Sequence, residues 1–275
     1  MLLPLGKIWY TEKPSGREHW RETMHRNSGD FYSQLAYWYD EIFPVSVQQI
    51  DFVHNRISSF TEADPKRLLD VGCGTGALAV TLSIMGVKVT GIDLNRDMIE
   101  QARFKADELG TTPEFYVMDM HKLTNNLAGK SFEVITCLGN TLVHMNSLEE
   151  VRDALIQFDK LLTPSGMMIL QVLNYDKVLK EGITVLPTIE QEGILFERSY
   201  RWKAGDPTIT FSTRLTTPDT LKPIEQETEL FPLRQHQLQS LLEELDYPKQ
   251  SWYGSYAEEP ADESLLPLIV CASRK

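Results

Sequence analysis

The sequence predicts an α/β protein with a Rossmann-like, doubly wound sheet, and three observations support this fold class. Short apolar segments alternate with amphipathic helical segments between residues 67 and 174, as in parallel sheets. One of these segments ends in a glycine-rich turn at residues 72–76. From residue 193 to residue 230 the pattern changes to period two, which is typical of an antiparallel meander. We therefore expect a mostly parallel seven-stranded sheet with an inserted β meander over the active site.

The individual elements follow from their own residue patterns. Aromatic residues at helical spacing predict a helix over residues 31–43. Five apolar, β-branched segments predict the parallel strands at residues 67–71, 87–92, 114–117, 132–137 and 167–172. The helices that connect the strands are expected at residues 77–85, 96–109 and 148–162. Asn95 is a good N-cap for the second helix, and Pro164 with Gly166 is a typical stop after the third.

The last third of the chain contains the meander and the end of the sheet. Its strands are expected at residues 193–202, 208–216 and 225–230, before a helix at 234–245 and two segments, 251–256 and 266–272, that complete the sheet. Loops at the carboxyl edge of a parallel sheet lie over the ligand crevice. The predicted organisation is an N-terminal extension (1–30), a core (31–173 and 232–275) and an inserted cap (174–231).

Composition narrows the possible partners and compartments. The net charge of −12 and the pI near 5.0 would repel a polyanion, so we expect no nucleic-acid partner. Three cysteines without paired spacing indicate reduced thiols, and six histidines without ligand spacing indicate no metal site. The uncharged run at residues 71–87 is too short to span a membrane, and the N-terminus lacks a signal-peptide layout. We expect a soluble, cytoplasmic protein with no membrane partner.

The most specific motif is a strand that ends in an acid and turns through three glycines into a helix. Its residues are Asp70, Gly72, Cys73, Gly74, Thr75 and Gly76. Such a turn brings backbone N–H groups and a helix N-terminus close to a ligand. The dinucleotide fingerprint G-x-G-x-x-G/A is matched only loosely. Asp70 would repel a pyrophosphate but would tolerate a cationic ligand.

Two further acids end the next two predicted strands. Asp93 follows the turn by about twenty residues, where α/β folds place an acid that binds ribose hydroxyls. Asp119 follows the third strand. Helix capping or solvation in a loop is the alternative for both acids. Carboxylates at three successive strand ends nevertheless favour a nucleoside ligand.

The order D-V-G-C-G-T-G resembles motif I of the class I S-adenosylmethionine-dependent methyltransferases. The resemblance implies S-adenosylmethionine as cofactor, with the glycines at its methionine end, Asp93 at the ribose, and Asp119 with Met120 at the adenine. It also implies that the last strand is antiparallel. The motif Y-x-x-x-A-x-x-Y-D resembles the N-terminal segment of small-molecule methyltransferases, in which Tyr32 and Tyr39 would cover the cofactor or pack in the core. The cofactor-binding residues implied are Tyr32, Tyr39, Asp70, Gly72, Cys73, Gly74, Thr75, Gly76, Asp93, Leu94, Met98, Asp119, Met120 and Leu138.

The segment after the fourth strand concerns the acceptor. Residues 138–141 read L-G-N-T where enzymes that methylate base amines or glutamine carry [N/D]-P-P-[Y/F]. With N-Y-D at 174–176, the segment resembles the branch that includes glycine and sarcosine N-methyltransferases. This implies that Asn140, His144 and Tyr175 border the acceptor, although His144 and Tyr175 could also be packing residues.

One position departs from that branch. Leu173 stands where the branch has an arginine that binds the amino-acid carboxylate, which speaks against glycine as substrate. An arginine of the meander could take that role, although strand arginines are more often solvated. The candidates are Arg198, Arg201 and Arg214.

We therefore expect S-adenosylmethionine-dependent methyl transfer to a small-molecule acceptor, favouring an amine, by in-line displacement. A neutral amine can attack unaided, whereas an oxygen nucleophile would want a base. The alternatives are a NAD-linked oxidoreductase, a methyltransferase of protein or RNA, and a cofactor-binding regulatory protein without catalysis. The meander could also be a homodimer contact.

Overall fold

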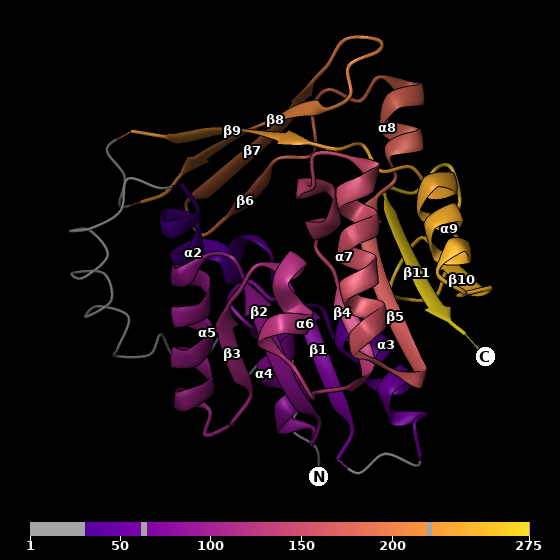
Figure 1. Ribbon diagram of the computed structural model, residues 1–275. Helices are drawn as coiled ribbons and strands as arrows, with labels where there is room; N and C mark the ends of the chain where they lie inside the picture. The colour runs from indigo at the N-terminus through magenta and orange to yellow at the C-terminus, as the bar shows by residue number, and fades with distance from the viewer. Residues whose placement is uncertain (1–30, 62–64, 219–221, 275) are drawn as a thin grey trace.

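The computed structural model describes residues 31–61, 65–218 and 222–274. Its centre is a seven-stranded sheet in the order β10-β11-β5-β4-β1-β2-β3 (Figure 1). The strands β1 to β5 pair in parallel, and β11 is antiparallel to both of its neighbours. The bounds are β1 Arg67–Val71, β2 Lys88–Asp93, β3 Glu114–Val117, β4 Phe132–Cys137, β5 Leu162–Leu173, β10 Lys249–Tyr253 and β11 Pro267–Ser273. The predicted fold class, including the antiparallel last strand, is confirmed.

Helices cover both faces of this sheet. They are α2 Phe31–Ile42, α3 Val47–Ser58, α4 Ala77–Ile84, α5 Arg96–Glu108, α6 Leu123–Asn126, α7 Leu148–Leu161, α8 Tyr175–Glu181 and α9 Gln235–Glu244. Neighbouring strand residues feed two separate cores: Leu69 and Ile135 pack with α7, whereas Leu68 and Val134 pack with α3 and α4. Because successive side chains of a strand point to opposite faces, such strands must be apolar on both sides.

A second, antiparallel sheet lies across one end of the first, at the top of Figure 1. Its strands are β6 Ile189–Gln191, β7 Ile194–Arg201, β8 Ile209–Thr216 and β9 Ile224–Leu230. Phe196 and Leu215 on its inner face pack against Leu35 and Ile42 of α2. Tyr200 packs at the other end with residues of α7 and α8. The predicted meander is confirmed as an element, while the boundaries of the cap remain a prediction.

The structure differs locally from the expected elements. The turn expected at residues 163–166 belongs to β5, which already starts at Leu162 and pairs with Phe132 before an irregularity in register. The pairs with β4 pass from Phe132–Leu162 directly to Val134–Met167, so residues 163–166 form an unpaired irregularity within β5. The helices α3, α6 and α8 and the strand β6 were not predicted. The extension at residues 1–30 lies outside the described residues.

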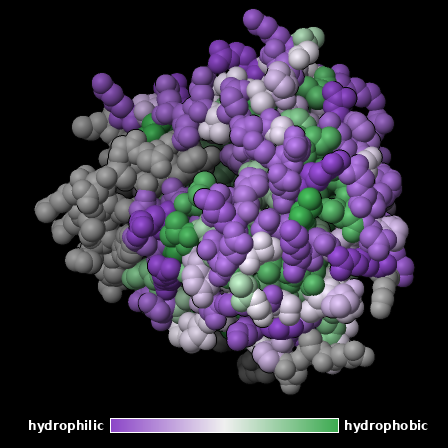
Figure 2. All heavy atoms as spheres, in the orientation of Figure 1, coloured by the Kyte–Doolittle hydropathy of each residue, from purple (hydrophilic) through white to green (hydrophobic). Residues whose placement is uncertain are grey.

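The face of the molecule seen in Figure 2 is mostly polar. Figure 2 shows mostly hydrophilic side chains on one face, with small and separate apolar groups among them. None of the helices in the described ranges is long and apolar enough to cross a membrane.

Candidate active site

A crevice of about 480 Å³ lies at the carboxyl ends of the central parallel strands, within the usual size range of small-molecule sites. The predicted residues on its wall are Tyr39, Gly72, Gly74, Asp93, Leu94, Met98, Asp119, Met120 and His144. The wall also includes residues that the sequence analysis did not assign to a ligand: Val71, Ile92, Asn95, Met118, Gly139, Thr141 and Met145. The sequence could have indicated these residues, because they are neighbours of assigned residues in the loops that follow successive strands.

The glycine turn is closely packed on both sides. Gly72 and Gly74 have φ of +69° and +54°, in the left-handed region. A Cβ on Gly72 would lie 2.5 Å from Cγ2 of Thr141, and one on Gly74 would lie 3.2 Å from Cε1 of Tyr39. Gly76 has another role, since its Cβ would collide with helix α5 and with Phe115 of β3. Two glycines of the turn therefore line the crevice, and the third permits close helix packing.

Asp93 is held at the end of β2 by two backbone donors. Its Oδ2 accepts from the Gly74 N–H at 3.0 Å, and its Oδ1 accepts from the Asn95 N–H at 2.9 Å. Burial raises the pKa of Asp93, although the backbone hydrogen bonds oppose that rise. Each carboxylate oxygen retains lone pairs, and the residue lines the crevice. The carboxylate is therefore fixed in place and can accept further hydrogen bonds from a ligand.

The wall beyond Asp93 combines apolar side chains with one acid. Leu94 is 75 % exposed, and Met98 and Met120 lie on the same wall. Asp119 accepts from the His121 N–H at 3.0 Å, and this hydrogen bond lowers the pKa of its carboxyl group. Such a surface suits a flat aromatic ring with polar edges.

Helix α2 covers the turn and is anchored to it. Asp40 accepts from Oγ1 of Thr75 at 2.6 Å and forms an ion pair with Lys105 of α5, also at 2.6 Å. Lys105 Nζ additionally donates to the Thr75 carbonyl oxygen at 2.9 Å. This ion pair places the neighbouring Tyr39 against Gly74. Tyr32 lies in the same helix, but its side chain is outside the described residues.

Several predicted cofactor residues lie behind the wall instead of on it. Asp70 is 4 % exposed and accepts from Oγ1 of Thr136 at 2.7 Å. Burial raises the pKa of Asp70 to about 7, despite that hydrogen bond, and the nearby Asp93 adds to the rise. Leu138 is buried, and the Cys73 thiol points toward the Gly74 carbonyl oxygen. These residues support the turn from beneath.

The three predicted acceptor residues have different environments. Asn140 adopts φ of +69°; its Oδ1 accepts from the Leu173 N–H at 2.9 Å, and its Nδ2 donates to the Tyr175 hydroxyl at 3.1 Å. Tyr175 is fully buried, which raises its pKa, so the hydroxyl stays protonated. His144 lies on the crevice wall, and removal of surrounding water lowers the pKa of its imidazole. At neutral pH that imidazole is therefore uncharged and can accept a hydrogen bond.

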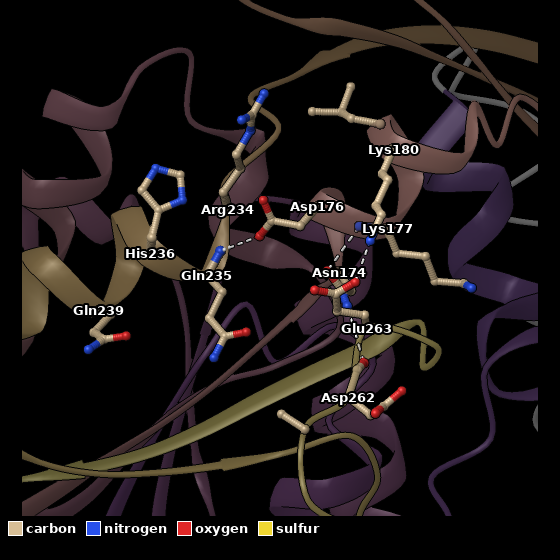
Figure 3. Close-up of a pocket in the computed structure, with 12 residues that line it drawn as sticks. Asn174, Asp176, Lys177, Lys180, Arg234, Gln235, His236, Gln239, Asp262 and Glu263 are labelled. Atoms are coloured by element: carbon tan, nitrogen blue, oxygen red, sulfur yellow. Dashed lines mark hydrogen bonds and ion pairs between the residues drawn. The ribbon is translucent and has the colours of Figure 1, made fainter.

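A second, larger hollow of about 700 Å³ lies between α8, α9 and the loop before β11 (Figure 3). Asp176 accepts from the Gln235 N–H at 3.0 Å, and Lys180 forms an ion pair with Glu263. Asn174 caps α8 by accepting from the Lys177 N–H at 3.2 Å. These contacts hold the two helices and the loop together. The crevice at the glycine turn, and not this hollow, carries the predicted ligand residues.

Comparison with known proteins agrees with this geometry. Residues 68–166 match the family described as "Methyltransferase domain". A Geobacillus sp. (strain WCH70) protein named as a methyltransferase is 35% identical over 158 residues, covering 55% of this chain and 62% of its own length. A glycine/sarcosine N-methyltransferase of Aphanothece halophytica is 28% identical over 74% of each chain. A ubiquinone biosynthesis O-methyltransferase of Nitrosococcus oceani is 34% identical over 52% of this chain and 60% of its own.

Solved structures show the same fold. An S-adenosylmethionine-dependent methyltransferase from Clostridium acetobutylicum superposes with a TM-score of 0.74 at 16% identity, covering 89% of this chain and 99% of its own. SAM-bound CalS10 from Micromonospora echinaspora, an amino pentose methyltransferase, superposes with a TM-score of 0.62 at 19% identity. The match covers 97% of this chain and 100% of CalS10. Residues 68–166 therefore match a methyltransferase domain, and the fold is the one that solved S-adenosylmethionine-dependent methyltransferases have.

Proposed function

We propose that the protein binds S-adenosylmethionine in the crevice and transfers its methyl group to an amine of a small molecule. The observation that carries the proposal is the convergence of the glycine turn, Asp93 and Asp119 on one wall. Relatives named for glycine, sarcosine and ubiquinone biosynthesis support a small acceptor. The net charge of −12 argues against a nucleic-acid acceptor.

The residues present fit this cofactor. The ring of Tyr39 packs on Gly74 where a side chain would otherwise stand, and both residues line the crevice; a Cβ on Gly139, also on the wall, would point into open space. Asp93 would hold the ribose hydroxyls, and Leu94 with Met120 would flank the adenine. The cofactor, when bound, supplies an electrophilic methyl group on a sulfonium. The protein's part is then to align the acceptor and exclude water.

The acceptor atom follows from the groups around the crevice. A neutral amine needs no strong base to attack carbon. Tyr175 cannot act as one, because burial raises the pKa of its hydroxyl and keeps it protonated. His144 is neutral at neutral pH and could accept a hydrogen bond from an N–H of the acceptor amine. An oxygen acceptor is the second candidate because relatives include O-methyltransferases.

Transfer of label from S-adenosyl-[methyl-³H]methionine into a size-fractionated cell extract tests this proposal. We expect label in the small-molecule fraction, where chromatography and mass spectrometry identify the methylated atom. Label in protein or RNA would contradict the small acceptor. Binding of the cofactor in calorimetry without any transfer would favour a regulatory role.

Replacement of Asp93 by alanine is expected to weaken cofactor binding about a hundredfold. The change removes an acceptor for two ribose hydroxyls and also leaves the Gly74 and Asn95 N–H groups without a partner. A hydrogen bond to a charged group contributes about 1.5–3 kcal/mol, and 1.4 kcal/mol corresponds to a factor of ten. Titration calorimetry with S-adenosylhomocysteine measures the change, with the exposed Asp107→Ala on α5 as control. Equal affinities of both variants for S-adenosylhomocysteine would show that Asp93 does not bind the cofactor.

A further inference from the structure

A row of polar side chains crosses the inner face of the small sheet, among apolar neighbours. Arg198 on β7, Thr213 on β8 and Gln226 on β9 are successive register partners. They share their face with the buried Phe196 and Tyr200, because alternate residues of a strand point the same way. Polar groups in such surroundings normally have polar partners. A row of three polar side chains beside buried aromatic rings is therefore a feature of the cap that needs an explanation.

The Arg198 guanidinium lies among aromatic rings and has few hydrogen-bond partners. Its guanidinium carbon lies 6.0 Å from the ring centroid of Phe43 and 5.7 Å from that of Phe196. Nη2 donates to the Pro187 carbonyl oxygen at 2.7 Å. Nε is buried without a hydrogen-bond partner, as is Oε1 of Gln226, and Arg198 forms no ion pair within the described part of the chain. Burial also lowers the pKa of Arg198, which indicates that its charge is poorly compensated.

The other two candidate arginines of the meander contrast with it. Arg201 forms an ion pair with Glu227 at 3.3 Å. Arg214 lies between Glu197 at 3.8 Å and Glu225 at 3.6 Å. Both arginines are exposed on the outer face. Their charges are balanced by the sheet itself, whereas that of Arg198 is not.

Two series of contacts connect Arg198 with the crevice. On the side of α2, the ring of Tyr39, which lines the crevice, lies 5.2 Å from that of Phe43 by centroids. Phe43 in turn lies under the Arg198 guanidinium. Arg198 therefore sits above the helix that covers the glycine turn.

The second series starts at the end of β4. Asn140 follows the crevice residue Gly139 and donates to the Tyr175 hydroxyl at 3.1 Å. The rings of Tyr175 and Tyr200 lie 6.2 Å apart, and their hydroxyls interact. Tyr200 is two residues from Arg198 on the same face of β7. Arg198 is thus linked by neighbouring side chains to the covering helix on one side and, through Tyr200 and Tyr175, to Asn140 on the other.

We propose that Arg198 binds an anionic group, a carboxylate or a phosphate, of the methyl acceptor. This inference rests on the proposed function and assigns the acceptor a chemical class. An oxyanion would supply the acceptor that Nε–H lacks and would compensate a desolvated positive charge. Gln226, two strands away, could accept from an N–H or O–H of the same molecule. The acceptor would then be a small amine that carries a negative charge.

The first test measures the arginine directly. Sodium acetate and inorganic phosphate are titrated separately into ¹⁵N-labelled protein saturated with S-adenosylhomocysteine, and the arginine Nε–H signals are followed. The Arg198 signal is identified by its loss in Arg198→Gln. We expect a saturable shift of that signal with one of the two anions, which identifies the anionic group. A signal unmoved by both anions would overturn the proposal.

The second test uses label transfer into the small-molecule pool of a cell extract. Arg198→Gln is expected to lower the rate of label transfer at least tenfold when the small-molecule pool is dilute. The difference should be smaller when the pool is concentrated, because the substitution weakens the binding of the acceptor. Arg198→Lys should recover part of the loss, and Arg214→Gln should behave as wild type. A labelled product without an anionic group, or equal rates in Arg198→Gln and Arg214→Gln, would contradict the proposal. If wild type transfers no label, the proposed function fails, while the titration still decides the role of Arg198.

Discussion

Replacing Lys105 with methionine is expected to lower the free energy of unfolding by about 3 kcal/mol and to weaken cofactor binding at least tenfold. Lys105 is 8 % exposed and is paired with Asp40. Removal of one partner of a buried ion pair costs about 3–5 kcal/mol. We take the lower end because the side chain of Asp40 is 31 % exposed. Binding weakens because the pair holds α2, and with it Tyr39, on the glycine turn.

Chemical denaturation and calorimetry with S-adenosylhomocysteine measure the two effects. Lys160→Met, on the exposed surface of α7, is the matched control and should change neither quantity. A double-mutant cycle with Asp40→Asn isolates the pair, since the two changes together should cost less than their sum. Additive effects would mean that the two side chains act independently.

Replacing Asp70 with asparagine is expected to stabilise the protein at pH 8 by as much as about 4 kcal/mol. Burial raises the pKa of this carboxyl group from 3.8 to about 7, and each pKa unit corresponds to about 1.4 kcal/mol. Between these two values the folded protein keeps a proton that the unfolded chain releases. The free energy of unfolding therefore falls as pH rises from about 4 to about 7, and it levels off above. Asparagine keeps an oxygen acceptor for Thr136 without the charge.

Urea unfolding curves from pH 5 to pH 8 measure this effect. The wild type should lose stability relative to Asp70→Asn across this range, and Asp153→Asn, exposed on α7, should follow the wild type. Parallel curves for wild type and Asp70→Asn would show that Asp70 titrates normally. A smaller slope should remain in Asp70→Asn, because burial also raises the pKa of Asp93.

Local signals were sufficient for the features that depend on neighbouring residues. The N-cap at Asn95 forms as predicted, with Oδ1 accepting from the Met98 N–H at 3.0 Å. The strand at residues 132–137 has the predicted bounds. Caps, turns and strand periodicity are set within a few residues, so a single chain carries them. At Pro164 the chain forms an irregularity within β5 instead of a turn that precedes the strand, because Leu162 already pairs with Phe132, thirty residues earlier.

The sequence by itself determined the α/β fold, the glycine turn and the acids that follow the strands, because strand periodicity and motif spacing encode them. Only the tertiary structure decided which side chains share a surface. It showed that Gly76 serves packing, that Lys105 is buried against an acid 65 residues earlier in the chain, and that Arg198, unlike Arg201 and Arg214, faces inward. These distinctions depend on sheet register and on contacts between distant segments. A lysine in a helix or an arginine in a strand looks the same in the sequence whether it is solvated or buried.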